Sequence, residues 1–304
     1  MNIIGKRKIW YAISLIMIVP GVISLVMFGL KLGIDFNSGQ LSVVRGAVTQ
    51  EKVDTAAKGL GFEDLVLVQS GSDQTQIRYR DPSPQAKHEA NHQKFKAGLE
   101  KAGLTELSFD SVGPSVSTSI ARNAIISLVV VSLAIVLYIA YAFRNTPPPV
   151  SPWGFGIMAI AALLHDALFI LGLFSILGHF FGVEIDALFV TAILTVIGFS
   201  VHDTIVVFDR IRENLRREKG SFEEIVNTSI LETIARSVNT SLTVILTLLA
   251  LLLFGGESIR LFVLALLIGI ASGTYSSIFN ASPLLVTWHN WRLKRLGKAK
   301  TAKA

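Results

Sequence analysis

The sequence contains no cysteine, which excludes disulfide bonds, thiolate metal sites and cysteine nucleophiles. It also has little charge: 16% of its 304 residues are Asp, Glu, Lys or Arg, against about 25% in soluble domains. Apolar residues instead make up 51% of the chain. These proportions favour a membrane protein over a soluble enzyme, and the formal charge of +6 must be interpreted from where the basic residues lie.

Several apolar segments are long enough to cross a bilayer, which needs about 17–25 residues of helix. They are 9–30, 124–143, 153–177, 187–208, 237–254 and 261–286. The first follows Lys6, Arg7 and Lys8, as the apolar core of a signal peptide would. However, its 22 residues exceed the about 7–15 of such a core, and no small-residue cleavage site follows it. We therefore expect a retained helix and six transmembrane helices.

Basic residues are concentrated on one side of these predicted helices. Alternate loops place sixteen of the 28 lysines and arginines on the side of the N-terminus, and eleven of the other twelve lie in the long segment 31–122. The side rich in basic residues is cytoplasmic by the positive-inside rule, and long segments cross the membrane regardless of charge. Residues 1–8 and the basic tail 287–304 are thus predicted to be cytoplasmic. The basic residues of this tail indicate contact with membrane lipid rather than with nucleic acid.

The segment 31–122 has the composition of a soluble domain and alternates between strand and helix patterns. We predict strands at 40–48, 64–70, 74–80 and 104–112, a Gly-Ser-Asp turn at 71–73, and helices at 49–59 and 83–103. This βαββαβ order is typical of a small α+β ferredoxin-like domain. We therefore expect an external ferredoxin-like domain, followed by a five-helix transmembrane bundle over 123–286, and a contact role for the domain rather than catalysis.

Two short motifs in the sequence suggest chemistry that their context does not support. His88-Glu89-Ala90-Asn91-His92 matches H-E-x-x-H, in which two histidines bind zinc and the glutamate acts as a base. Both histidines share a helical face with Phe95 and Leu99, so we expect them to pack on the sheet without an open metal position. The match to G-x-G-x-x-A at 154–159 opens a membrane span instead of following a strand, and we discard it.

Charged residues inside the apolar segments are the main functional candidates, because a carboxylate at the bilayer centre costs roughly 2.5–3.5 kcal/mol by insertion scales. Asp166 lies halfway along the third segment beside His165. Asp203 lies five residues before the cytoplasmic end of the fourth, about 7–8 Å deep. Arg236 opens the fifth segment from the same side, and its long side chain can reach the level of Asp203. We therefore expect these two residues to pair.

Two interpretations of this pair stay open. It is either a static ion pair that docks two helices, or a proton site in which moving the guanidinium changes the proton affinity of Asp203. Ser200 lies three residues before Asp203 and can hydrogen-bond it, whereas His202 points about 100° away toward another helix. The same alternatives hold for Asp166, which forms either a packing pair with its neighbouring histidine or a proton site.

The segment 209–236 is expected to be a cytoplasmic amphipathic element. It begins as an extension of the fourth helix, and Ser221 and Glu224 then have the spacing of a capping box. The apolar face that follows predicts a helix lying on the membrane interface before the chain enters the fifth span. In the sixth span, Gly269 and Gly273 have the GxxxG spacing of a close helix contact.

A set of longer stretches forms a specific pattern over nearly the whole chain. They are LGIDF at 32–36, VGP at 112–114, HD at 165–166, GFSVHDTIVVFDRIREN at 198–214, ARSVNTSLT at 235–243, FGG at 254–256 and GIASGTYSSIFNASP at 269–283. Together they resemble the SecD/SecF family of bacterial protein-export membrane proteins, in its SecF branch, within the resistance-nodulation-division superfamily. The chain departs from the family at two positions. The family commonly has Asn where this chain has His202, and it commonly has Gly-Gly where this chain has Ser38-Gly39.

The resemblance implies a non-enzymatic subunit of the Sec export machinery in the bacterial cytoplasmic (inner) membrane. It implies pairing with SecD, work on exported preproteins beside the SecYEG translocon with SecA, and the proton-motive force as energy source without any cofactor. It assigns the proton pathway to Asp203 and Arg236. The secondary candidates are Asp166, His202, Ser200 and Asp35.

Two other functions stay open on the sequence alone. One is a small-molecule, proton-coupled exporter half of the same superfamily, which would need larger external domains to line a substrate funnel. The other is a non-transporting scaffold of the translocon, in which Asp203 and Arg236 are only structural.

Overall fold

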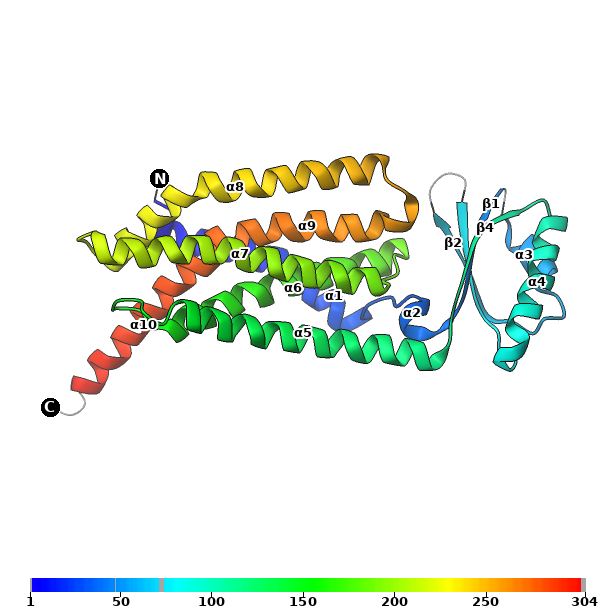
Figure 1. Ribbon diagram of the computed structural model, residues 1–304, viewed down its shortest axis with the longest axis horizontal. Coiled ribbons are helices and arrows are strands. Elements are labelled where there is room, and N and C mark those ends of the chain that lie inside the picture. The colour runs from blue at the N-terminus through cyan, green and yellow to red at the C-terminus, as the bar shows by residue number, and fades with distance from the viewer. Residues whose placement is uncertain (1, 47, 71–73, 302–304) are drawn as a thin grey trace. The chain divides into compact units, whose positions relative to one another are not determined.

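The structure is a computed structural model that describes residues 2–46, 48–70 and 74–301. It is mostly helical, with one small antiparallel sheet near the N-terminus (Figure 1). Its contacts divide the chain into two compact units, which we call the helical unit and the sheet unit. The helical unit comprises Met1–Leu30, Ser127–His179 and Leu188–Ala304, and the sheet unit comprises Lys31–Ile126 and Phe180–Ala187.

The sheet unit contains four antiparallel strands in the spatial order β2-β3-β1-β4. Its elements in chain order are α2 (Ile34–Asn37), β1 (Gly39–Arg45), α3 (Gln50–Ala57), β2 (Glu63–Ser70), β3 (Gln74–Arg80), α4 (Gln85–Lys101) and β4 (Thr105–Val112). Helices α3 and α4 cover one face of the sheet (Figure 1). Their apolar faces meet the strands in one core, whose fully or largely buried members are Val44, Val53, Ala56, Ile77, Tyr79, Phe95, Leu99 and Leu104.

The predicted strands and helices of this segment are present within a few residues of their expected ends. The short helix α2 was not expected, and the turn predicted at 71–73 lies outside the described residues. Both non-glycine residues with positive φ angles in the described chain, Ser38 at 58° and Asp64 at 52°, lie in this unit. Asp64 falls where the pairing of β2 with β3 shifts register, so the strained backbone accompanies a bulge.

Six helices of the described chain are long and apolar enough to cross a membrane, as the sequence predicts. Five are α1 (Arg7–Phe28, extended by a 3-10 turn at Ile4–Lys6), α5 (Pro114–Ala142), α6 (Pro152–Phe181), α7 (Ala187–Arg217) and α8 (Phe222–Phe254). The sixth is composite. It joins a 3-10 turn (Glu257–Ile259), α9 (Arg260–Ser276), a π-helical segment (Ser277–Ala281) and α10 (Ser282–Thr301).

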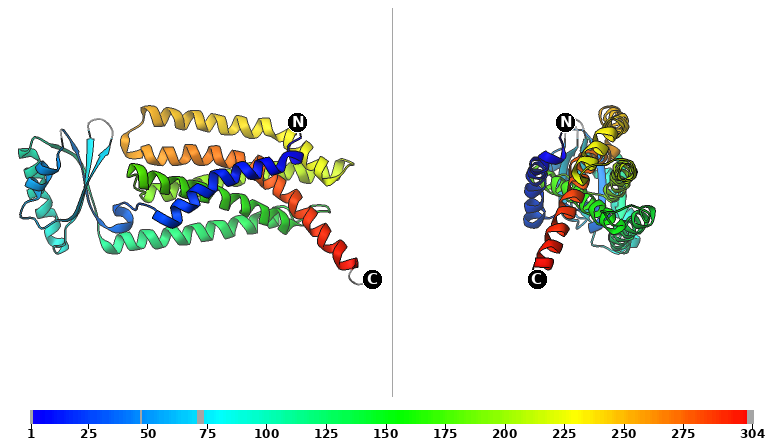
Figure 2. Two further views of the ribbon diagram at one scale, coloured as in Figure 1. Left: turned by 180° about the vertical axis from the view of Figure 1, so that it is seen from behind. Right: turned by 90° about the vertical axis from the view of Figure 1, so that its left-hand side faces the viewer.

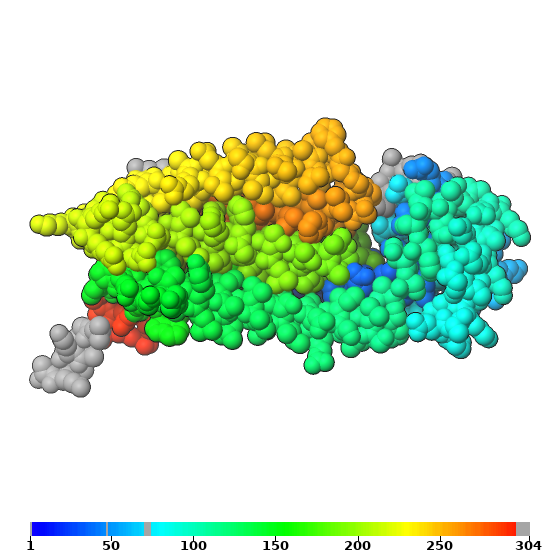
Figure 3. Space-filling model, in the orientation of Figure 1, coloured from blue at the N-terminus to red at the C-terminus, as the bar shows by residue number. Residues whose placement is uncertain are grey.

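Burial separates inner from outer helices in the helical unit. Helices α6, α7 and the composite sixth helix contain most of the buried residues, whereas α1, α5 and α8 present large apolar side chains outward. Figure 3 shows α8 at the edge of the unit with α9 visible between α8 and α7, and Figure 2 shows α1 crossing the opposite face. Outward apolar side chains on the outer helices fit lipid, as expected for a multi-pass membrane protein.

Small residues let the inner helices approach closely. An added Cβ at Gly269 would lie 2.4 Å from Val196 Cγ2, and one at Gly273 would lie 3.0 Å from Ser200 Cβ. The GxxxG pair therefore packs α9 directly against α7, which confirms the predicted helix contact.

The ends of α7 and α8 next to their connecting loop also pack on each other. Ser221 and Glu224 form the predicted capping box at the start of α8. Arg210 Nε lies 2.6 Å from Glu232 Oε2, which ties the extension of α7 to α8. Helix α8 then continues unbroken through Arg236, so the expected turn into the membrane at that residue is absent from the structure.

Candidate functional site

Asp203 lies on the buried face of α7, with 1% of its surface exposed. The Ser241 hydroxyl of α8 lies 3.3 Å from Asp203 Oδ2, and Thr274 of α9 donates to the Ser241 oxygen over 2.5 Å. The Ser241 hydroxyl also lies 2.9 Å from the Ser237 carbonyl, so its single proton serves either that carbonyl or Asp203. Among the described residues, Asp203 therefore accepts one long hydrogen bond of variable occupancy, at the end of a chain of two hydroxyls, one from α8 and one from α9.

Asp166 lies on α6 and is fully buried, but it has many more donors. Ser200 of α7 and Ser276 of α9 donate to its Oδ2 over 2.5 and 2.7 Å. Ser272 and His165 Nδ1 reach its Oδ1 over 3.3 and 3.0 Å. Four donors on two oxygens satisfy the needs of a buried carboxylate, so Asp166 links α6, α7 and α9 as a hydrogen-bonded centre.

The π-helical segment positions part of this network. Ser277, at its start, donates to the Ser200 carbonyl over 3.0 Å, and its hydroxyl lies 2.9 Å from that of Thr204. The close contact of Gly273 with Ser200 brings α9 near enough for these bonds. Single π-helical turns are frequent at functional sites because they break the regular hydrogen-bond ladder and redirect side chains.

The predicted bond from Ser200 to Asp203 is not formed, because Ser200 donates to Asp166 instead. The two residues are three apart, so they differ by about 60° around α7 and face different neighbours. Ser200 faces α6 and α9, and Asp203 faces α8. The Ser200 hydroxyl therefore belongs to the surroundings of Asp166, while the Asp203 carboxyl group forms a separate site.

The predicted ion pair between Asp203 and Arg236 is also absent from the described residues. Arg236 is exposed, whereas Ser237 and Ser241 are the residues of α8 buried at the level of Asp203. Arg236 precedes Ser241 by five residues, which places it about 140° away around the helix. His202 is exposed on α7, so the expectation that it faces another helix of this chain is wrong for the described residues.

His165 extends the polar surroundings of Asp166 toward α1. Its Nε2 is buried without a hydrogen-bond partner among the described residues, and its ring centroid lies 6.3 Å from that of Tyr275. Tyr275 donates to the Trp10 carbonyl, and Ser14 of α1 donates to Asn280 over 2.9 Å. This polar surrounding adds side chains that the sequence alone did not single out.

Sequence reasoning missed the hydroxyls that surround both carboxylates. They are Ser241, Ser272, Thr274, Ser276 and Ser277. Their signal was available, because the stretches ARSVNTSLT and GIASGTYSS place several hydroxyls within apolar spans. The hydrogen-bond partners of these hydroxyls could not be predicted, because they depend on how α8 and α9 pack on α7.

The H-E-x-x-H residues lie on α4, with the second histidine under the sheet. His92 Nδ1 lies 3.3 Å from the Tyr79 hydroxyl, its Nε2 lies 3.4 Å from Glu106 Oε2, and its ring stacks on Phe109. Burial holds the pKa of His92 below its usual value, against the opposing charge of Glu106. His88 Nε2 lies 2.8 Å from the Ser83 carbonyl. Both histidines have structural partners, which supports the packing interpretation of the motif.

Asp35, the last of the secondary candidates, lies in the sheet unit. Its Oδ2 accepts a hydrogen bond from the backbone N–H of Ala187 over 2.8 Å. Ala187 is the first residue of α7, so Asp35 satisfies one of the free N–H groups at the start of that helix.

Comparisons with known proteins agree on one family. Residues 93–291 match the family described as protein export membrane protein SecD/SecF, C-terminal. The protein translocase subunit SecF of Thermobaculum terrenum is 52% identical over 303 residues, covering 95% of this chain and 94% of the relative. That of Anaerolinea thermophila is 42% identical over 302 residues, with 96% of each chain covered.

A solved structure gives the same result for the fold. The crystal structure of SecDF from Thermus thermophilus, described as a translocon-associated membrane protein, superposes with a TM-score of 0.82 at 33% sequence identity. The match covers 95% of this chain and 39% of that chain, so this chain spans about two fifths of the longer protein.

Proposed function

Because this chain belongs to the SecD/SecF family of protein export membrane proteins, we propose that it acts as a SecF-type subunit that uses the proton-motive force in late steps of protein translocation. The observation that carries the proposal is the buried Asp203 at the end of a hydroxyl chain. A proton-motive force on the order of 150–200 mV supplies about 3.5–4.5 kcal/mol per charge moved, enough to drive a helix rearrangement.

Of the two buried carboxyl groups described in the helical unit, Asp203 is the better suited to bind and release a proton. Hydrogen bonds to an ionised carboxylate favour that form, and Asp166 has four such donors. Within the described part of the chain, Asp203 has one, the Ser241 hydroxyl, whose proton can turn to the Ser237 carbonyl when Asp203 is protonated. We assign the proton switch to Asp203 and a fixed, helix-linking role to Asp166.

Arg236 is proposed to act from the outward face of α8. That face also carries Asn239, Thr240 and Thr243, all exposed within an apolar span. Polar and charged side chains in a span face protein or water rather than lipid. We propose that SecD covers this face, because the SecDF relatives contain a segment like this chain within a longer one. Arg236 would then modulate the proton site from the interface.

The surroundings of this subunit follow from the same family. We propose that it lies in the bacterial cytoplasmic membrane with both termini inside, as the distribution of basic residues predicts. The larger assembly would be the SecYEG translocon with SecA and exported preproteins, with no enzymatic reaction and no cofactor in this chain. The sheet unit, with its βαββαβ chain order and strand order β2-β3-β1-β4, supports a ferredoxin-like external domain over about 31–122.

The proposal is tested by neutralising Asp203 in proteoliposomes that contain this chain, SecD and the translocon. Asp203→Asn keeps the size and hydrogen-bonding capacity of the side chain but cannot carry a proton. We expect it to co-purify with SecD and to lose the proton-driven stimulation of export, roughly tenfold or more, and Arg236→Met to behave alike. Asp209→Asn is the matched control, because Asp209 lies on the same helix with its side chain 57% exposed.

Asp203 and Arg236 form no ion pair among the described residues, so the double variant tests whether they pair in the working complex. If Asp203 and Arg236 only stabilise each other, each single neutralisation leaves a charge unpaired, and neutralising both restores assembly and export. Full proton-dependent export by the double variant would therefore contradict the relay.

A further inference from the structure

Two of the buried polar atoms in the helical unit have no hydrogen-bond partner among the described residues and lie on facing helices. They are His165 Nε2 on α6 and Asn280 Nδ2 in the π-helical segment. The two residues are only 9% and 3% exposed. Native proteins pair nearly all such atoms, because a buried polar atom without a partner loses its bonds to water and gains nothing in return.

The two atoms have opposite hydrogen-bonding roles. His165 Nδ1 lies 3.0 Å from Asp166 Oδ1, and a carboxylate only accepts, so the proton of the neutral imidazole is on Nδ1. His165 Nε2 is then an acceptor that needs a donor. Asn280 Oδ1 accepts the Ser14 hydroxyl over 2.9 Å, so Asn280 Nδ2 is a donor that needs an acceptor.

Tyr275 and Ser14 place the two side chains in one neighbourhood. The ring centroids of His165 and Tyr275 lie 6.3 Å apart. The Ser14 hydroxyl lies 3.3 Å from the Tyr275 hydroxyl and closer, at 2.9 Å, to Asn280 Oδ1. Tyr275 donates its own proton to the Trp10 carbonyl over 2.9 Å, so its oxygen can accept one more hydrogen bond.

A water molecule matches this set of groups. It can accept a hydrogen bond from Asn280 Nδ2 and donate its two protons to His165 Nε2 and the Tyr275 oxygen. Buried waters in proteins make about three hydrogen bonds to polar groups that the protein itself leaves unpaired. One water therefore satisfies both atoms at once.

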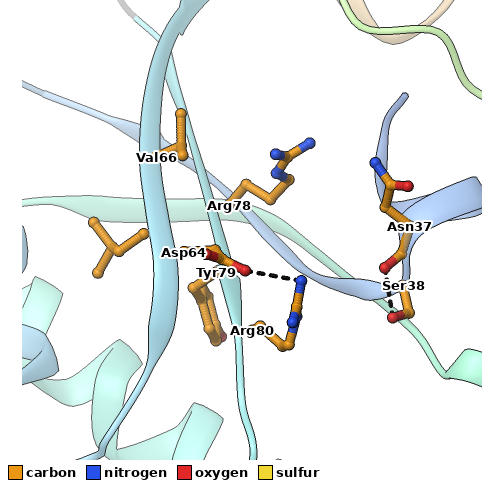
Figure 4. Close-up of a pocket in the computed structure, with 8 residues that line it drawn as sticks. Asn37, Ser38, Asp64, Val66, Arg78, Tyr79 and Arg80 are labelled. Carbon is orange, nitrogen blue, oxygen red and sulfur yellow. Dashed lines mark hydrogen bonds and ion pairs between the residues drawn. The ribbon is translucent and has the colours of Figure 1, made fainter. Parts of the chain in front are cut away.

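A cleft of the sheet unit is also polar, but its charged side chains have partners. Its volume is about 320 Å³, and Figure 4 shows Arg78 and Arg80 in its wall. Arg80 Nη2 lies 2.8 Å from Asp64 Oδ2, and Arg78 Nη1 lies 3.0 Å from Glu184 Oε2. Unpaired buried atoms, rather than open space, thus distinguish the region around His165.

We propose that the region bounded by His165, Tyr275 and Asn280, which we call the water site, binds one water molecule. The bond from this water to His165 Nε2 keeps the ring in the tautomer whose Nδ1 proton faces Asp166. The water site thereby maintains one of the four donors of the Asp166 carboxylate. The inference concerns Asp166 and does not depend on proton coupling at Asp203.

The first test is an experimental structure of the full chain in lipid nanodiscs, at a resolution that shows ordered water. We expect one water within about 2.7–3.2 Å of both His165 Nε2 and Asn280 Nδ2. A direct hydrogen bond between the two side chains would overturn the proposal. So would the lack of density between them while other buried waters are visible.

The second test removes the donor. Asn280→Leu has a similar size but cannot bond the water, so His165 Nε2 loses its partner. We expect Tm in detergent to fall by about 2–4 °C, the shift for the net loss of roughly one hydrogen bond. If Asn280 Nδ2 had no partner in the wild type, an apolar replacement would instead raise Tm or leave it unchanged, and either result would overturn the proposal.

A spectroscopic measurement separates loss of the water from poor packing of the new leucine. The chain has six histidines, so the ring nitrogens of His165 can be assigned by nuclear magnetic resonance through the signals missing in His165→Gln. We expect the Nε2 resonance to move in Asn280→Leu toward that of a nitrogen without a hydrogen bond, and an unchanged resonance would overturn the proposal. The matched control is Asn214→Leu. Asn214 is buried and donates to Ser229 and Glu232, so its loss should lower Tm without moving the His165 signals.

Discussion

At the scale of the residue, the two buried carboxyl groups of the helical unit differ by the number of donors around them. Asp166 is held by a histidine and three serines, and Asp203 by a single shared hydroxyl. A buried carboxylate with few donors is costly to keep charged, so its environment must change when it ionises. In the proposed function, this requirement would couple protonation of Asp203 to movement of the helices that supply Ser241 and Thr274.

His92 predicts the pH dependence of the sheet unit. Burial lowers its pKa below the usual value of 6.5, so the unfolded chain binds more protons than the folded chain as pH falls through that value. Stability is therefore expected to be full above about pH 6.5 and to decrease below it. The measurement is amide exchange of Ile77 and Phe95 in the full-length protein at pH 7.5 and 5.5.

A substitution at His92 tests whether this residue causes the loss of stability at low pH. His92→Gln keeps a hydrogen-bonding side chain but does not titrate, so the decrease between the two pH values should become smaller. His88→Gln, on the same helix, is the control and should retain it. An unchanged pH dependence in His92→Gln would contradict the assignment.

At the scale of the element, helix contacts depend on small residues at crossing points. Helices α1 and α6 cross at Gly21 and Gly172, where an added Cβ would lie 2.8 or 2.6 Å from the opposite Cα. One turn further, the hydroxyls of Ser24 and Ser175 lie 2.9 Å apart, and Ser175 donates to the Gly29 carbonyl. The crossing therefore combines close backbone approach with interhelical hydrogen bonds.

This crossing predicts a sharp sensitivity to one methyl group. Gly172→Ala should destabilise the protein in detergent by about 1–3 kcal/mol, because the added carbon meets backbone that cannot rotate away. Gly198→Ala is the matched control. Gly198 lies in α7, where no described residue beyond its own stretch of helix comes within 4 Å of the Cβ position, and the substitution should be neutral or stabilising by up to about 1 kcal/mol. Equal melting temperatures for the two variants would contradict the role of the crossing.

At the scale of the whole molecule, the chain combines two units with separate cores. The core of the sheet unit is formed by the strands and by α3 and α4, without residues from the long helices. The helical unit has its own buried residues and two carboxyl centres. Each unit therefore has the apolar burial that independent folding requires.

The sheet unit should fold when produced as residues 35–115. The fragment contains the whole apolar core but loses Glu184, so Arg78 becomes exposed to water at little cost. We expect one cooperative unfolding transition with a free energy on the order of 5 kcal/mol, from the usual stability per residue. Urea unfolding followed by circular dichroism measures it, and a broad, non-cooperative transition would show that the unit depends on the membrane helices.

The sequence by itself determined the elements whose causes are local. Apolar runs of sufficient length predict the six long helices, period-2 patterns predict the strands, and the Ser221–Glu224 spacing predicts the capping box. It also selected Asp166 and Asp203, because a carboxylate inside an apolar run is exceptional wherever the helix packs.

Only the tertiary structure decided which groups these carboxylates meet. Ser200 serves Asp166 because α7 rotates that hydroxyl toward α6 and α9, and Arg236 turns outward because Ser237 and Ser241 occupy the inner face of α8. The bond from Asp35 to Ala187 joins residues 152 positions apart. Helical periodicity gives the relative angle of two side chains on one helix, but the neighbour that each side chain faces is set by the packing of all the helices together.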